Sequence, residues 1–159
     1  PVVLRPGYIS LEMLQELLGE VKMDRGLLIT DSSVRPKAPG MKYRHYAPKA
    51  DLAIVEGETE AVIRKITALA KEAKAEGKRV GVIATDETVD RYPEGCIIKS
   101  IGSREEEETI AHHLYEVLRE FDECDAKVIY SEAFYTPRMG QAIMNRLLKA
   151  AGHKRIKAE

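Results

Sequence analysis

A basic and aromatic segment in the first third of the chain carries side chains that could recognise a nucleotide. It spans residues 36–48 and reads P-K-A-P-G-M-K-Y-R-H-Y-A-P, with three rings (Tyr43, His45 and Tyr46) set among basic residues such as Lys42 and with no acidic residue. Cations bind phosphate oxygens and flat rings stack on bases, so this pattern favours a nucleotide or an RNA end as partner. The alternative is a solvated, Pro-rich spacer whose tyrosines pack on a neighbouring domain.

Prolines decide the backbone of this segment. Pro36, Pro39 and Pro48 each fix φ, remove a backbone donor and bias the preceding residue away from helix. Gly40 permits backbone conformations that other residues avoid. We therefore expect an extended or turning chain, neither a helix nor a central strand, in which several side chains can reach one ligand together.

The stretch A-P-G-M-K-Y-R-H-Y-A-P-K resembles the interdomain linker of the Sua5-type threonylcarbamoyl-AMP synthases. Upstream, P-V-V-L-R-P-G (1–7) resembles the last strand of their catalytic YrdC-like domain, and G-Q-A-I-M-N-R-L-L-K-A-A (140–151) resembles their small C-terminal Sua5 domain. Ala38 departs from the family pattern, which has Ser there, and this removes one hydroxyl. The resemblance implies three parts: the end of a YrdC-like domain (1–19), an interdomain linker (20–50) and a Sua5 domain (51–159), with the larger part of the catalytic domain missing from this chain.

The resemblance also implies the activity of a parent protein. Sua5-like synthases are cytoplasmic nucleotidyltransferases that join L-threonine, bicarbonate and ATP into threonylcarbamoyl-adenylate and release pyrophosphate. Their product feeds the t6A modification of tRNA through a downstream transferase. ATP is then a substrate, with Mg²⁺ bound beside it through the missing catalytic domain. We expect the segment in hand to be inactive alone, because no catalytic residue is recognised in it.

In this interpretation the linker covers the bound nucleotide and keeps water from a labile adenylate. Arg5 approaches the nucleotide from the side of the catalytic domain. Lys42 supplies charge, and Tyr43, His45 and Tyr46 supply rings or hydrogen bonds. These five residues are the predicted nucleotide-binding set.

Two other functions fit the same residues. The α/β part could act as a regulatory module that holds a nucleotide or a protein partner without catalysis, or the linker could contact RNA. A net charge of −1 disfavours a general nucleic-acid-binding surface. The sequence has no G-x-G-x-x-G and no Walker signature, which disfavours a dinucleotide or a P-loop nucleotide.

The composition is that of one ordinary domain with an appendage: 159 residues, 44% hydrophobic and 32% charged. Cys96 and Cys124 have no metal-ligand spacing, and we expect buried or incidental thiols in a reducing cytoplasm. No apolar run approaches the length of a membrane span, so no membrane partner is expected.

Beyond residue 50, apolar strands alternate with amphipathic helices. Strands are predicted over 52–55, 80–84, 96–101 and from 128 onward, with a small fifth strand at 155–156. Helices are predicted after the cap Thr59, after a capping box formed by Ser103 and Glu106, and from Gly140. The alternation is typical of an α/β, Rossmann-like parallel sheet with helices on both faces.

Ligands of such sheets bind beyond the carboxyl ends of the strands. Gly102-Ser103 is expected there at a helix N-terminus, where an anion is attracted. The four acids at 105–108 would repel a phosphate, and they favour a solvated face that satisfies the helix dipole. The predicted strand ends carry these residues: Glu56, Thr85-Asp86, Gly102-Ser103 and Ser131-Glu132.

The first residues form a separate pattern. Val2 to Leu4 is predicted to be a terminal strand that pairs with a part of the protein outside this chain. Ser10 is predicted to cap a short leucine-rich helix that ends at Gly19. Residues 20–35 show no sustained periodicity and are expected to form a loop.

Overall fold

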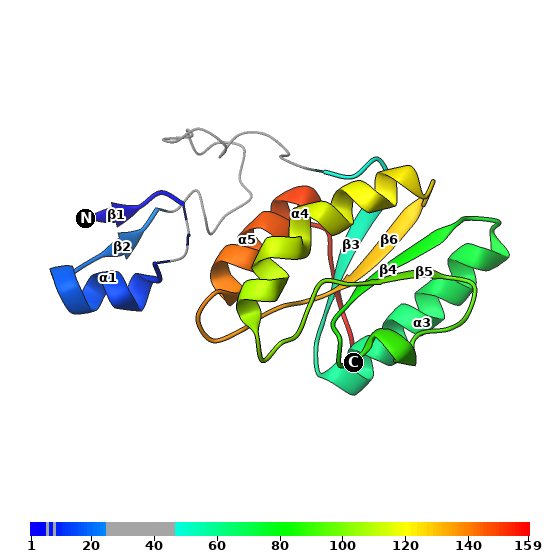
Figure 1. The fold of residues 1–159 in the computed structure, drawn as a ribbon, viewed down its shortest axis with the longest axis horizontal. Coiled ribbons are helices and arrows are strands. Elements are labelled where there is room, and N and C mark those ends of the chain that lie inside the picture. Colours follow the sequence, from blue (N-terminus) through cyan, green and yellow to red (C-terminus); the bar gives the residue numbers. More distant parts are fainter. Residues whose placement is uncertain (6, 8, 25–46) are drawn as a thin grey trace.

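The computed structural model describes residues 1–5, 7, 9–24 and 47–159 (Figure 1). A first group of elements comprises β1 (Val2–Val3), α1 (Leu11–Leu18) and β2 (Lys22–Met23). The second group forms the α/β domain, in chain order: β3 (Asp51–Glu56), α3 (Thr59–Ala75), β4 (Val80–Ala84), the 3₁₀ turn η1 (Val89–Arg91), β5 (Ile97–Ser100), α4 (Glu107–Glu123), β6 (Val128–Glu132), α5 (Gly140–Ala150) and β7 (Arg155–Lys157).

The α/β domain is built on a five-stranded parallel sheet with the order β5-β4-β6-β3-β7. Every residue of β4 is buried, as are the four apolar residues of β3. A strand that is covered on both faces must be apolar throughout, which explains the short unbroken runs V-G-V-I-A and L-A-I-V.

Helices cover both faces of this sheet, with α3 on one face and α4 and α5 on the other (Figure 1). Alternate strand residues divide between the two layers, since successive side chains of a strand point to opposite faces. Ile83 packs with Leu114 on the α4–α5 face, whereas Val82 packs with Ile66 on the α3 face. Gly81 is required where α4 approaches closely, because a Cβ there would lie 2.5 Å from the Phe121 ring.

The connections that follow β3 and β6 run in opposite directions across the sheet. After β3 it crosses by α3 to β4, on the β6 side of the sheet, and after β6 it crosses by α5 to β7, on the β3 side. The two crossing helices lie on opposite faces. The carboxyl ends of β3 and β6 therefore flank a topological switch point, the usual ligand position in open α/β sheets.

The predicted fold class is confirmed, and so are the two ends of α1. Ser10 Oγ accepts a hydrogen bond from the backbone N–H of Met13 at 3.2 Å, and Gly19, with φ of 75°, ends the helix. The predicted start of α3 is displaced by one residue. Thr59 is the first helical residue, and its predecessor Glu58 makes no capping hydrogen bond through its side chain.

Two local predictions were wrong. Ser103 and Glu106 form no capping box: α4 begins at Glu107, and the Ser103 hydroxyl donates instead to Glu87 Oε1 at 2.6 Å. The stretch expected to be loop contains β2, which pairs in parallel with β1, so the terminal strand has a partner within the chain. Two-residue strands leave no periodicity to read, so their pairing had no signal in the sequence.

Candidate functional site

A buried carboxylate lies at the carboxyl end of the central strand β6. Glu132 is 1% exposed, and both of its oxygens accept hydrogen bonds. Oε1 accepts from the Thr88 hydroxyl at 2.5 Å and from the Tyr92 hydroxyl at 2.6 Å. Oε2 pairs with the Arg104 guanidinium at 2.6 Å. A buried charge is costly unless it is paired and hydrogen-bonded, and Glu132 is both.

The two hydroxyl donors come from the connection after β4. Thr88 is held in a tight turn, in which its backbone N–H donates to Thr85 O at 3.0 Å and its side chain accepts from the Thr85 N–H at 3.2 Å. Tyr92 is 7% exposed. Burial raises the pKa of the Tyr92 phenol, and the charge of Glu132 and its hydrogen bond raise it further. Tyr92 therefore stays protonated, as a donor, far above neutral pH.

Arg104 joins the loops that follow β5 and β6. Besides its pair with Glu132, its guanidinium donates to the backbone carbonyl of Ala133 at 3.0 Å and lies 5.3 Å from the centre of the Phe134 ring. The Nε atom is buried and has no hydrogen-bond partner among the described residues. Arg104 thus keeps donor capacity that the protein itself does not use.

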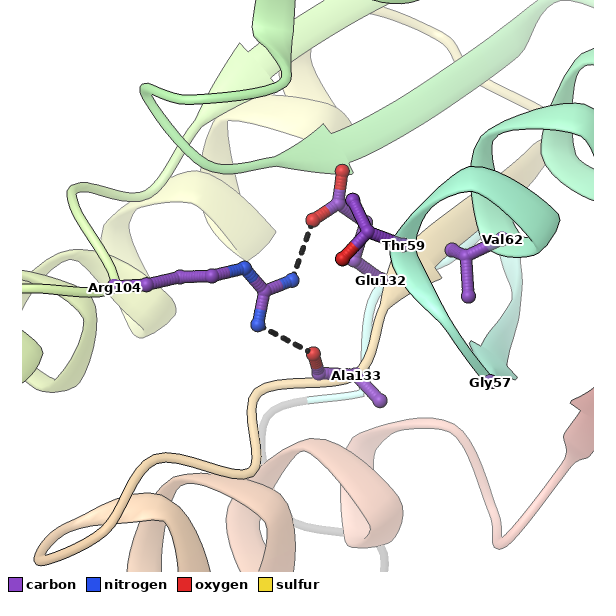
Figure 2. Close-up of a pocket in the computed structure, with 6 residues that line it drawn as sticks. All are labelled: Gly57, Thr59, Val62, Arg104, Glu132 and Ala133. Carbon is purple, nitrogen blue, oxygen red and sulfur yellow. Dashed lines mark hydrogen bonds and ion pairs between the residues drawn. The ribbon is translucent and has the colours of Figure 1, made fainter.

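A recess opens beside this arginine, between the carboxyl ends of β3 and β6. Its empty volume is about 300 Å³, including the part that is open to solvent. In Figure 2, Arg104 reaches toward Glu132 and Ala133 from one side, and Thr59 and Val62 of α3 face it from the other. Gly57, Thr59, Val62, Arg104, Glu132 and Ala133 line the recess.

The anion position predicted at Gly102-Ser103 is filled by a side chain of the protein. Glu87 Oε1 accepts from the Ser103 hydroxyl at 2.6 Å and from the Arg104 backbone N–H at 3.0 Å. Burial acts to raise the pKa of Glu87, but hydrogen bonds from Ser103, Thr85 and the backbone lower it to about 2. A free anion has no place at this position, because a carboxylate of the chain already uses its donors.

The run of four acids at 105–108 is solvated except at one position. Glu107 is 4% exposed, and its carboxylate accepts from the backbone N–H groups of Arg138, at 3.2 Å, and Met139, at 2.6 Å. Burial acts to raise its pKa, but hydrogen bonds, among them these, lower it. The prediction of a solvated face was wrong for Glu107, which instead anchors the chain that enters α5.

Of the predicted nucleotide-binding set, only Arg5 lies within the described residues. It is exposed, two residues beyond β1, and its charge helps burial to lower the pKa of Lys149 at the end of α5. The other four, Lys42, Tyr43, His45 and Tyr46, lie outside the described residues. The next described residues after them are anchored, since Pro48 is buried and the backbone N–H of Lys49 donates to Asp122 Oδ1 at 2.7 Å.

Sequence reasoning placed Glu132 at the strand ends but missed its partners, Thr88, Tyr92 and Arg104. One signal was available: Glu132 directly continues the apolar strand V-I-Y-S, and a carboxylate in that position needs a cation. Which cation it would be depends on the tertiary fold.

Metal-binding clusters and membrane-spanning helices are absent from the described part of the chain. No group of three or more His, Cys, Asp or Glu side chains there is arranged to hold a metal ion. Cys96 and Cys124 are free thiols of intermediate burial. No helix in the described part is both long and apolar enough to cross a membrane.

Comparison with known proteins gives a consistent match. The family described as threonylcarbamoyl-AMP synthase, C-terminal domain, matches residues 9–152. The threonylcarbamoyl-AMP synthase of Bacillus subtilis is 45% identical over 157 residues, which are 99% of this chain and 43% of the relative. The Pyrococcus abyssi enzyme of the same name is 40% identical over 157 residues, 99% of this chain and 44% of the relative. The chain thus spans less than half the length of these relatives.

Solved structures agree with these matches. The crystal structure of Pyrococcus abyssi Sua5 complexed with L-threonine superimposes with a TM-score of 0.86 and 37% identity, over 100% of this chain and 44% of that chain. The crystal structure of the C-terminal Sua5 domain from Pyrococcus horikoshii covers 70% of this chain and 100% of its own, with a TM-score of 0.56 and 36% identity.

Proposed function

The chain belongs to the family of threonylcarbamoyl-AMP synthase C-terminal domains, and on that basis we propose that it is the linker and C-terminal part of such a synthase. The parent protein joins ATP, L-threonine and bicarbonate into threonylcarbamoyl-adenylate and releases pyrophosphate. Its product serves the t6A modification of tRNA in the cytoplasm, through a downstream transferase. The observation that carries the proposal is the 45% identity to a named synthase over 99% of this chain.

The proposal divides the chain into the end of a YrdC-like catalytic domain (1–19), a linker (20–50) and a Sua5 domain (51–159). No residue of α1 is buried, although its leucines repeat at helical spacing. Apolar surface of this kind is typical of a face that packs against another domain. Most of the large hydrophobic side chains found exposed belong to this first part: Val2, Ile9, Met13, Leu17 and Leu18.

The linker acts in this proposal as a cover for the nucleotide. Lys42 and Arg5 neutralise phosphate charge, while Tyr43, His45 and Tyr46 contact the rest of the ligand and exclude water from the adenylate. Mg²⁺ accompanies ATP through residues of the catalytic domain, outside this chain.

The Sua5 domain then serves as the fixed base of the cover. The hydrogen bond from the Lys49 backbone N–H to the Asp122 side chain ties the end of the linker to α4. The buried Pro48 adds packing at the same place. A cover that is anchored at its end loses less conformational entropy when it closes over the ligand.

The experiment is an assay of the full-length parent with ATP, L-threonine and bicarbonate, following pyrophosphate release and threonylcarbamoyl-adenylate. We expect product from the full-length protein and none from residues 1–159 alone. A parent truncated after residue 19 should lose most of its activity, since the cover is removed. A full-length protein that forms no adenylate would contradict the proposed activity. A truncated parent with full activity would contradict the role of the linker.

A further inference from the structure

The recess lies where the topology of an open α/β sheet predicts a ligand, yet none of its lining residues belongs to the predicted nucleotide-binding set. Gly57 follows β3 and Ala133 follows β6, the two strands that flank the switch point. We propose that this recess binds a small oxyanion, a phosphate or a carboxylate, separately from the nucleotide that the linker covers. The proposal goes beyond the proposed function and does not depend on it.

Arg104 is the principal donor toward such a ligand. A guanidinium carries five N–H donors, and two protein bonds, to Glu132 and to Ala133, involve one nitrogen each. The Nε atom is too deeply buried to reach a ligand in the recess, so the spare donors are the second N–H groups of the two terminal nitrogens, on a side chain of which one third is exposed. A planar fork with spare donors beside a recess suits the oxygens of a carboxylate or a phosphate.

The carboxylate of Glu132 does not cancel the preference of Arg104 for an anionic ligand. Its two oxygens accept three hydrogen bonds from Thr88, Tyr92 and Arg104, so most of its acceptor capacity is used inside the protein. Among the other lining residues, Thr59 adds a hydroxyl donor beside the Arg104 guanidinium. Donors that converge on a recess favour a ligand that accepts hydrogen bonds, and an oxyanion accepts many for its size.

The start of α3 adds further donors. Thr59 is the first residue of this helix and lines the recess, and the side chain of Glu58 does not cap the helix. The first N–H groups of a helix have no partner within it. The nearby carboxylate of Glu60 is turned to Arg91, with bonds of 2.6 and 2.8 Å.

The entry to α5 shows how the same domain satisfies backbone donors when no ligand is needed. There the buried Glu107 carboxylate accepts from the backbone N–H groups of Arg138 and Met139. Among the residues that the structure describes, no side chain is recorded doing this at α3, where the recess opens. A free carboxylate or phosphate would supply there what Glu107 supplies at α5.

Size restricts the ligand further. The enclosed volume of the recess is about 50 Å³, far below the several hundred Å³ of pockets for drug-sized ligands. Gly57 has φ of 151°, and a Cβ there would lie 2.8 Å from the Ala158 carbonyl oxygen, so the chain packs closely at the edge of the recess. The recess therefore suits a small anion rather than a whole nucleotide.

The test is an NMR titration of the ¹⁵N-labelled full-length protein. Inorganic phosphate, pyrophosphate and acetate are added separately, and the backbone amide signals of Gly57 and Thr59 are followed. These signals report on the recess and not on the catalytic domain. We expect saturable shifts, and the anion that saturates them at the lowest concentration tells a phosphate site from a carboxylate site. The absence of saturable shifts with all three anions would overturn the proposal.

Variants identify the donor. Arg104→Gln combined with Glu132→Gln removes the cation without leaving an unpaired buried carboxylate, and it should weaken binding by about tenfold or more. Arg79→Gln, the same arginine substitution just before the amino end of β4, should bind like the wild type. Binding by the double variant at wild-type strength would overturn the proposal.

A milder variant keeps the proposal testable if the double variant does not fold. Thr59→Val keeps the Arg104–Glu132 pair and removes one hydroxyl at the recess. We expect anion binding that is several-fold weaker, with an unchanged melting temperature. If the double variant does not fold, anion binding by Thr59→Val at wild-type strength would overturn the proposal.

Discussion

The first 24 residues and the α/β domain use similar apolar patterns with opposite results. In the domain, the apolar side of each long helix meets the sheet, and Ile66 and Leu114 are fully buried. In α1, leucines at the same kind of spacing stay outside, with Leu17 83% exposed. Helix periodicity therefore indicates which side chains need a partner surface, but not whether the chain contains it. The domain holds its own core, and α1 presents a surface that another domain is expected to cover.

The largest expected effect separates these two regions directly. Phe121→Ala removes a fully buried ring from the α4 side of the core and should cost about 3–5 kcal/mol of unfolding free energy. Leu17→Ala should cost less than about 0.5 kcal/mol in the same 159-residue chain, because the side chain is already in water. Urea denaturation of both variants measures the difference. Similar costs would show that α1 has a buried partner within this chain.

The next effect concerns how buried carboxylates are held. Arg104→Met leaves Glu132 buried without its cation and should cost about 1–3 kcal/mol. Arg138→Met should cost less, since Glu107 keeps the backbone N–H groups of Arg138 and Met139, and the Arg138 side chain is 73% exposed. Chemical denaturation at neutral pH tests the ranking. An Arg138→Met cost that equals or exceeds that of Arg104→Met would contradict this account of Glu132.

The smallest effect is an acid dependence of stability. The folded-state pKa of Glu87 lies at about 2, below its ordinary value of 4.5, so its ionised form is favoured by folding. Its contribution is therefore fully present above pH 4.5 and is lost as the pH falls from 4.5 toward 2. Glu87→Gln should lower the melting temperature slightly at neutral pH, where the contribution is present, and should flatten its decline between pH 4.5 and 2. An identical acid profile in the variant would show that the Ser103–Glu87 contact contributes nothing.

The sheet and its helices could be predicted because each depends on a pattern within one short segment. The unbroken run V-G-V-I-A predicted a covered strand, and the serine before the α1 leucines predicted a cap. The recess could not be predicted in this way. Arg104 meets Glu132 across 28 positions and Glu107 meets Arg138 across 31, and no local pattern marks which partner each will take.

The predicted nucleotide contacts show another limit. Residue types and spacing predicted nucleotide contacts from the strip Lys42 to Tyr46, and the family model spans these positions without assigning them a role. The described residues add the anchor of Lys49 at its end but not the strip itself. Its role stays a prediction that only the parent protein can test.

The central claim is that the linker contacts the nucleotide, and the most direct measurement is ATP affinity and adenylate formation in the full-length His45→Ala variant. Loss of a charge-assisted contact costs about 1.5–3 kcal/mol, so we predict a loss of about ten- to a hundredfold in affinity with the fold intact. His112→Ala, the same change at an exposed position of α4, is the matched control and should behave as wild type. Affinity and adenylate formation within about twofold of wild type in His45→Ala, the range of an ordinary surface substitution, would contradict the claim.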